Sequence, residues 1–291
     1  MQNKYLWGVF WSISACLISA LNDLISKLSG SHLGGIQVLF FRFFFSTLFL
    51  LPLVIKNPQK FETRHLKIHG LRGGLFALAM LPWCYGLIQL PLPLVTTISF
   101  TTPLFVTIMA QIILKESVGW RRLMATLIGF AGIVVSTGFT YKGINGVVGL
   151  ALLATFLFAV LDIVNKRLLT LHEGIESMMF FSALWTTVLM LPLVIYHWQI
   201  PAWADLGLLA LLGLGANGLL GCLLKASACC DLSALQPLRY TEFIFSSLLS
   251  VLVFGQWPTM DVLLGIALIV PATLYLGHHE LKLEKRPPVL A

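Results

Sequence analysis

The sequence contains an apolar segment, Asp231 to Gly255, that is long enough to cross a bilayer yet carries two charged residues well inside it. Arg239 and Glu242 are spaced i and i+3, so on one continuous helix they would share a face. An ion at the bilayer centre costs at least ~2.5 to 3.5 kcal/mol, so such residues normally face a protein interior or a water-filled cavity. The pattern predicts that this helix forms one wall of a transport site, and that Glu242 contacts the positive part of a solute or carries a coupling proton.

Other charged residues inside apolar segments fall in two acid–base pairs, Asp23 with Lys27 and Asp162 with Lys166, each spaced i and i+4. One interpretation is local neutralisation within each helix, with the lysine reaching the headgroups. The other is that Asp162 and Arg239 on one side of the membrane, and Asp23 and Arg42 on the other, form gates that seal the two sides alternately. The buried amides bond either neighbouring helices or a ligand, and they are Asn22, Asn165, Asn217 and Gln236.

Several aromatic residues lie within apolar segments, away from the interfacial belts where Trp and Tyr usually collect. They are Trp83, Tyr85, Phe100, Trp185 and Tyr240. Such rings either stack on a flat or cationic ligand or pack in the core. We predict a substrate site with aromatic, amide and charged contacts, comprising Trp83, Tyr85, Phe100, Asn165, Arg239, Tyr240 and Glu242. The predicted gate or coupling residues are Asn22, Asp23, Lys27, Arg42, Asp162 and Lys166.

The composition is that of a membrane protein, since 58% of residues are hydrophobic and 11% charged, whereas about a quarter are charged in soluble domains. Basic residues cluster in short connections instead of forming a stripe, which predicts a lipid bilayer and no nucleic acid as partner. The five cysteines show neither Cys-x-x-Cys nor a Cys/His ligand spacing, so no metal and no cofactor are expected. Gly213-x-Gly215-x-x-Gly218 formally matches a dinucleotide fingerprint, but it lies within an apolar span and is typical of close helix packing.

A spanning helix needs about 20 mainly apolar residues, and the sequence offers ten such stretches. They are 5–28, 34–55, 67–89, 92–114, 119–138, 146–170, 175–197, 203–226, 232–255 and 259–278. If the N-terminus is cytoplasmic, nearly all basic connections lie inside, and only Lys27 and Lys142 lie outside. This asymmetry predicts that both termini are cytoplasmic.

The two halves of the chain are related. Leu51 to Ile55, Leu-Pro-Leu-Val-Ile, recurs as Leu191 to Ile195, a shift of 140. The same shift, or one residue less, relates Gly73 to Gly213, Phe100 to Tyr240 and Asp23 to Asp162. Because five helices is an odd number, the second copy enters the membrane from the opposite side. We therefore predict an all-α integral membrane protein of ten transmembrane helices in two inverted five-helix repeats, 1–140 and 141–280, followed by a cytoplasmic tail, 281–291.

The chain resembles the EamA-type members of the drug/metabolite transporter superfamily over essentially its whole length. The most recognisable signature runs from Leu94 to Phe105, followed by Lys115-Glu116, Gly119-Trp120-Arg121-Arg122 and Gly129-Phe130-x-Gly132. Within the superfamily the pattern is most similar to S-adenosylmethionine uptake transporters of intracellular bacteria, on Asn22-Asp23-x-x-Ser26-Lys27, Trp83-x-Tyr85-Gly86-Leu87 and Arg239-Tyr240-x-Glu242. The resemblance implies a central cavity lined by the first, third, fourth, sixth, eighth and ninth helices.

These observations lead us to expect a secondary transporter of the bacterial inner membrane, monomeric or homodimeric, that moves a small-molecule substrate by alternating access. The resemblance implies uptake of S-adenosylmethionine, with exchange for S-adenosylhomocysteine as one form of it. The same residues would serve an exporter of amino acids or cationic drugs. A passive channel and an integral-membrane enzyme are the other classes considered, but the inverted repeat favours alternating access, and no catalytic nucleophile or metal cluster is visible.

Overall fold

The computed structural model describes residues 4–29, 33–89, 98–116, 118–137, 146–196, 198–255, 257 and 260–284, and it is built of helices. The helices of the first half are α1 (Lys4–Ser29), α2 (Gly35–Lys56), η1 (Pro58–Phe61), α3 (Leu66–Gln89), α5 (Thr102–Ile113) and α6 (Trp120–Thr137). Those of the second half are α7 (Gly146–Thr170), α8 (Ile175–Tyr196), α9 (Trp203–Cys229), α10 (Leu232–Arg239), α11 (Thr241–Phe254) and α12 (Met260–Glu284). Five of them, α1, α2, α7, α8 and α9, are long and apolar enough to cross a membrane by themselves.

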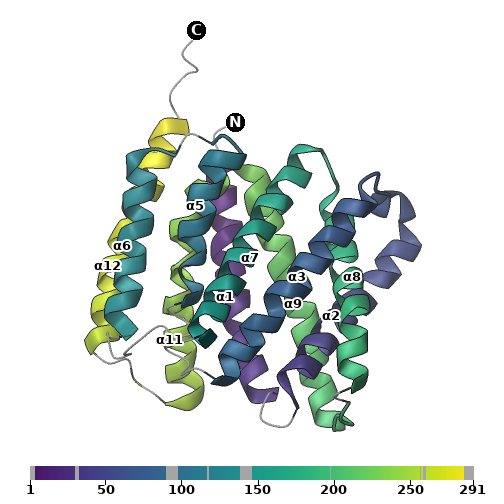
Figure 1. Ribbon diagram of the computed structural model, residues 1–291. Coiled ribbons are helices and arrows are strands. Elements are labelled where there is room, and N and C mark those ends of the chain that lie inside the picture. The colour runs from purple at the N-terminus through teal and green to yellow at the C-terminus, as the bar shows by residue number, and fades with distance from the viewer. Residues whose placement is uncertain are drawn as a thin grey trace.

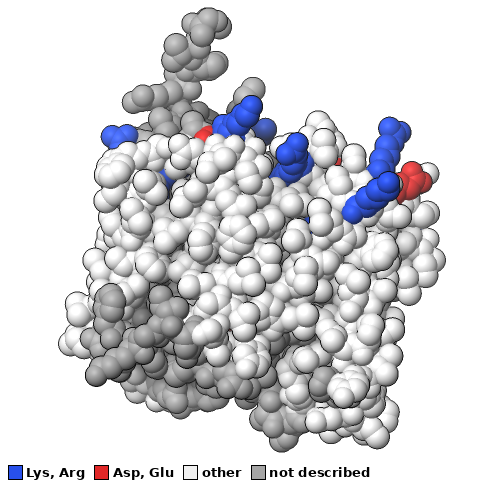
Figure 2. Space-filling model, in the orientation of Figure 1, with Lys and Arg blue, Asp and Glu red and all other residues white. Residues whose placement is uncertain are grey.

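The helices run side by side between two ends of the molecule, and α1 begins at the same end where α12 finishes (Figure 1). On the face seen in Figure 2, the Lys and Arg side chains gather at this end, and the rest of the described part of that face is almost free of charge. An apolar belt with charge at one end is the distribution that a bilayer-spanning bundle requires. This multi-pass arrangement agrees with the predicted membrane class.

The contacts between helices are symmetric: for each pair of packed helices named here, the equivalent pair in the other repeat is also packed. Helix α1 packs on α9 as α3 packs on α7, and α2 packs on α9 as α8 packs on α3. The self-related pairs α2–α8 and α6–α12 also pack on each other. The Thr47 and Thr187 hydroxyls, 140 positions apart, are 3.4 Å from each other, as expected for equivalent positions beside a two-fold axis. The predicted inverted-repeat fold is thus confirmed, and its register of 140 is visible in individual contacts.

Glycines allow the closest helix contacts, and these contacts repeat in the two halves. A methyl group at Gly73 of α3 would overlap Trp185 of α8, and one at Gly213 of α9 would overlap Phe45 of α2. Both the glycines and their aromatic neighbours are related by the shift of 140. In the predicted packing motif, Gly215 contacts the Asn22 side chain of α1. The glycine motif in α9 therefore serves helix packing, as the sequence predicts.

The ninth predicted span is broken, which corrects the expectation of one helix over 232–255. Helix α10 ends at Arg239, α11 begins at Thr241, and Tyr240 lies between them. The carbonyl of Leu238 accepts hydrogen bonds from the Thr241 hydroxyl (2.7 Å) and the Cys16 thiol (3.6 Å). An interrupted helix is tolerated at membrane depth when the surrounding protein satisfies the freed backbone groups. Arg239 and Glu242 therefore belong to two helices, although their charges still interact across the single residue Tyr240.

The break also places each charge at a favourable helix end. Arg239 lies in the last turn of α10, where the helix dipole is negative, and Glu242 in the first turn of α11, where it is positive. The first half shows a related turn at Phe100 and Thr101, directly before α5. Residues 90–97, which include the start of the fourth predicted span, lie outside the described part of the chain. The central polar residues are thus positioned by interrupted helices.

Candidate functional site

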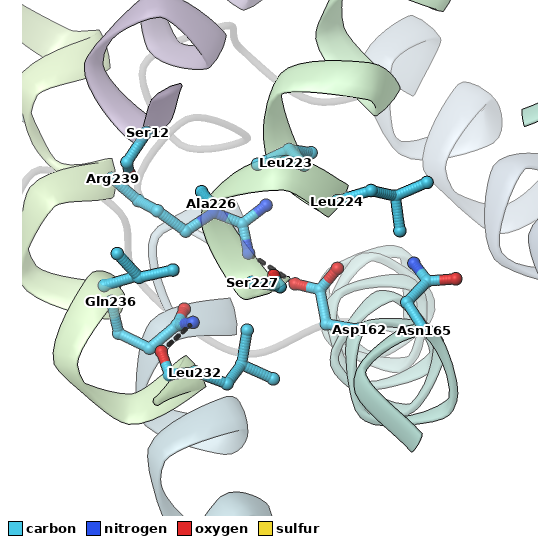
Figure 3. Close-up of a pocket in the computed structure, with 11 residues that line it drawn as sticks. Ser12, Asp162, Asn165, Leu223, Leu224, Ala226, Ser227, Leu232, Gln236 and Arg239 are labelled. Carbon is cyan, nitrogen blue, oxygen red and sulfur yellow. Dashed lines mark hydrogen bonds and ion pairs between the residues drawn. The ribbon is translucent and has the colours of Figure 1, made fainter. Parts of the chain in front are cut away.

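An ion pair between α7 and α10 is the centre of the candidate site. The Arg239 guanidinium donates to the Asp162 carboxylate at 2.6 Å, and the two side chains are 26% and 18% exposed. Figure 3 shows this pair crossing a pocket that is bounded by α1, α7, α9 and α10. The pocket is lined by Ser12, Asp162, Asn165, Leu223, Leu224, Ala226, Ser227, Leu232, Leu235, Gln236 and Arg239. Three predicted residues, Asp162, Asn165 and Arg239, therefore meet in one place.

This pocket is small in the structure. Its free space is about 20 Å³, enough for about one water molecule, whereas pockets for small organic ligands measure roughly 300 to 1,000 Å³. The Asp162–Arg239 pair lies across this space. A molecule of metabolite size does not fit beside the pair as it stands.

Of the two partners that the sequence offers for Asp162, the structure shows Arg239 and not Lys166. The Lys166 ammonium group donates to the backbone carbonyls of Ser227 and, at 2.6 Å, of Cys230. These carbonyls lie at the C-terminal end of α9, where the helix dipole attracts a cation. Lys166 thus fastens α7 to the end of α9, and Asp162 remains available to Arg239.

A buried hydrogen-bond chain reaches the pocket from α3, and the sequence reasoning missed its central residue, Arg72. Arg72 is fully buried, and its Nε donates to Asn165 Oδ1 at 2.7 Å. Its Nη1 lies 3.1 Å from His69 Nδ1, and His69 Nε2 lies 3.2 Å from Glu173 Oε1. A charged residue inside the third predicted span was the signal that could have identified it.

On the other side of the break lie the remaining predicted charges. Arg42 of α2 interacts electrostatically with Asp23 of α1, and these two charges attract each other. Asp23 also interacts with Glu242, and these two carboxyl groups repel each other when both are charged. The Ser19 side chain forms a hydrogen bond with Glu242. The side chain of Lys27 lies outside the described part of the chain. Glu242 thus interacts with the charge of Asp23 on one side and with that of the pocket residue Arg239 on the other.

The predicted aromatic contacts are distributed over different environments. Phe100 and Tyr240 pack against each other with ring centroids 5.6 Å apart, and Tyr240 is fully buried. Trp83 is partly buried against Phe158 of α7, while Tyr85 is 49% exposed. None of these rings lines the pocket. Phe100 and Tyr240 are equivalent positions of the two repeats and are buried because they meet each other between the repeats.

The buried amides also divide into two groups. Asn217 exchanges hydrogen bonds with Ser46 at 2.6 and 2.9 Å, which joins α9 to α2. Gln236 donates from Nε2 to the Leu232 carbonyl, and its Oε1 is buried without a hydrogen-bond partner among the described residues. Asn217 is therefore a helix-joining residue, whereas Gln236 presents an unused acceptor beside the pocket.

The signature residues after α5 position α10. The Glu116 carboxylate accepts hydrogen bonds from the backbone N–H groups of Leu232 (2.8 Å) and Ser233 (3.0 Å). Such N–H groups at the start of a helix have no partner within the helix itself. Arg122 of α6 pairs with Asp231 at 3.0 Å. This loop of the first repeat therefore fixes the start of the helix that carries Gln236 and Arg239. Within the described residues, no group of three or more His, Cys, Asp and Glu side chains is arranged to hold a metal ion.

Comparison with known proteins shows which family and which relatives the chain matches. Residues 6–138 and 146–277 each match the EamA-like transporter family. The chain is 38% identical to an S-adenosylmethionine uptake transporter of Rickettsia prowazekii over 281 residues, 96% of this chain and 95% of the relative. It is 28% identical to a riboflavin transporter of Vibrio cholerae over 98% of both chains. A solved crystal structure with 18% identity superposes with a TM-score of 0.79 over 96% of this chain and 99% of the other, a likeness that shows the fold alone.

Proposed function

Because the chain belongs to the EamA-like transporter family, we propose that it takes up S-adenosylmethionine across the bacterial inner membrane by alternating access. The observation that carries the proposal is full-length similarity at 38% identity to a transporter named for that substrate. The chain is a multi-pass membrane transporter and not an enzyme. The substrate, the direction and the access mechanism are the proposed parts.

The chemistry of the pocket supports this substrate. S-adenosylmethionine ends in an ammonium and a carboxylate, which are the charge partners that Asp162 and Arg239 now provide for each other. When the pair opens, the zwitterionic end of the solute replaces one ion pair by two, so no charge is left uncompensated. Glu242, on the neighbouring helix α11, is proposed to face the sulfonium. Trp83, which is partly buried on α3, is the proposed stacking partner of the adenine ring.

Two charge groups support alternating access. We assign the Asp162–Arg239 pair to the gate near the termini and Asp23 with Arg42 to the opposite gate, and Glu242 interacts with a charge of each group. In the proposed cycle the two groups open in turn as the repeats rock about their common axis. In this cycle Asp162 and Asp23 are gate residues, and the residues that lie between them bind the solute.

Competition for uptake tests the substrate. Purified protein in proteoliposomes is expected to accumulate labelled S-adenosylmethionine, and unlabelled S-adenosylmethionine and S-adenosylhomocysteine should compete. Riboflavin, amino acids and cationic drugs should not compete. Uptake of labelled riboflavin without any uptake of S-adenosylmethionine would refute the proposed substrate and favour the other group of relatives.

We further propose that the end bearing the start of α1 and the finish of α12 is cytoplasmic, because the basic side chains gather there. In a cysteine-free background, Lys60→Cys should resist a membrane-impermeant maleimide applied to intact cells, and Lys142→Cys should react. Preferential labelling at position 60 would reverse the orientation.

A further inference from the structure

Arg72 is a cation buried completely inside a membrane bundle, and its contacts end at the pocket. It lies on the second turn of α3 and contacts α7 through Asn165 and α8 through the carbonyl of Met178, to which Nη1 donates at 3.1 Å. A buried charge is expensive unless its donors are satisfied and an opposite charge is near. Apolar residues would join three helices at a lower free-energy cost than a buried arginine. We therefore expect a function of Arg72 beyond helix packing, and the groups that it contacts indicate which.

The chain of hydrogen bonds has a defined direction. Arginine has only donors, so His69 Nδ1 must be the acceptor and His69 Nε2 must carry the proton that faces Glu173. The Glu173 carboxylate supplies the opposite charge, and the Ser177 hydroxyl donates to it at 2.9 Å. The guanidinium is therefore held through Nε and Nη1 by groups of α3, α7 and α8, whereas Nη2 is buried without a hydrogen-bond partner among the described residues.

The same reasoning fixes the amide of Asn165. The atom that faces Arg72 Nε at 2.7 Å must be an acceptor, so it is Oδ1, and the NH2 group must point the opposite way. Figure 3 shows the amide nitrogen of Asn165 on the side of Asp162 and its oxygen on the far side. Because Asn165 lines the pocket, the bond from Arg72 presents a hydrogen-bond donor to whatever enters.

We propose that Arg72 is a positioning residue, which turns Asn165 into an obligatory donor for an acceptor group of the substrate. This inference rests on the proposed function, and for S-adenosylmethionine the acceptor is the carboxylate. A carboxylate that reaches Arg239 would then also receive the Asn165 NH2 group, so a cation and a neutral donor would bind one group together. Asp162, which lies beside both, would be released to the ammonium.

Asn165→Asp is the decisive variant because it separates the two sides of this amide. The carboxylate keeps an acceptor toward Arg72 and adds an opposite charge, so folding should survive with an unchanged or higher melting temperature. On the pocket side the variant replaces a donor by a negatively charged acceptor. We expect the affinity for S-adenosylmethionine, measured by binding of the labelled compound to purified protein, to fall at least tenfold.

Ser177→Ala is the matched control, since it removes a hydrogen bond to Glu173 from the same chain but leaves the Arg72–Asn165 contact in place. We expect a slightly lower melting temperature and unchanged affinity. A loss of affinity in Ser177→Ala as large as that in Asn165→Asp would contradict the inference. It would show that affinity depends on the strength of the whole hydrogen-bond chain and not on the orientation of the Asn165 amide.

A double-mutant cycle tests whether Arg72 acts through Asn165. Arg72→Met and Asn165→Ala should each weaken binding, and the double variant should bind no worse than Asn165→Ala alone. Additive losses would contradict the proposed route. Should Arg72→Met fail to fold, Asn165→Asp decides the question alone, because normal binding by that variant overturns the inference.

The outcomes separate this inference from the proposed function. If the wild type does not bind S-adenosylmethionine, the proposed function fails, and the ligand assigned to Asn165 fails with it. If the wild type binds and Asn165→Asp binds equally well, only the positioning role is refuted.

Discussion

The guanidinium of Arg239 and the carboxylate of Asp162 form an ion pair at 2.6 Å between the end of α10 and the middle of α7. The pair lies across the pocket and occupies both charges that the proposed substrate would use. In the proposed cycle, the strength of this pair sets the free-energy cost of opening the pocket.

Loss of one partner should cost stability, and loss of both should restore it. Asp162→Asn leaves Arg239 without its ion-pair partner, and because both side chains are partly exposed we expect a loss of about 1 to 3 kcal/mol, below the 3 to 5 kcal/mol typical of fully buried pairs. Asp162→Asn with Arg239→Gln should regain most of the melting temperature. Both variants should lose uptake, and a double variant that transports normally would show that the pair plays no part in transport.

Glu242→Gln should fold and fail in transport. The Arg239 guanidinium already has Asp162 as its ion-pair partner, so neutralising Glu242 does not leave it uncompensated. Loss of a desolvated charge contact typically costs ~2 to 5 kcal/mol, which is well over tenfold in affinity. Uptake into proteoliposomes and thermal melting measure the two effects. A well-folded variant with normal uptake would remove Glu242 from the site.

Gln236→Met should leave stability unchanged or raise it while lowering substrate affinity. An unsatisfied buried acceptor costs about 1 to 3 kcal/mol, and methionine removes the orphan Oε1 at similar volume. If that oxygen accepts a donor of the substrate, affinity should fall about tenfold. The contrasting variant is Asn217→Leu, which breaks satisfied hydrogen bonds to Ser46 and should melt earlier. Unchanged affinity in Gln236→Met would indicate that only water uses this acceptor.

Acid should weaken the bond network around Glu173. Partial burial raises the pKa of this loop carboxyl, but hydrogen bonds from Thr63, His69 and Ser177 outweigh it and hold the pKa below its ordinary value near 4.5. A lowered pKa in the folded state adds stability that is fully present above the unfolded pKa and is lost as pH falls through the folded pKa. The melting temperatures of the wild type and Glu173→Gln should therefore differ most near pH 7 and converge below pH of about 4. A difference that stays constant over this range would contradict the prediction.

The sequence by itself determined the membrane class, the two repeats and most of the charged residues whose burial is expensive, Arg72 excepted. Hydropathy and periodicity are local properties, so the spans and the register of 140 can be read without a structure, and Thr47 and Thr187 confirm the register. A charge inside an apolar span is costly wherever its partner lies, which is why Asp162, Arg239 and Glu242 could be selected in advance.

The tertiary structure alone decided the partners of these residues. The sequence left two partners open for Asp162, Lys166 on the same helix and Arg239 on another. The structure pairs Asp162 with Arg239, while Lys166 donates to carbonyls at the end of α9. The break at Tyr240 depends on Cys16 and other groups that satisfy the freed backbone, and no local pattern reports them. Arg72 reaches Asn165 across 93 positions of sequence. Such contacts arise from the packing of whole helices, whose geometry depends on all the side chains between them.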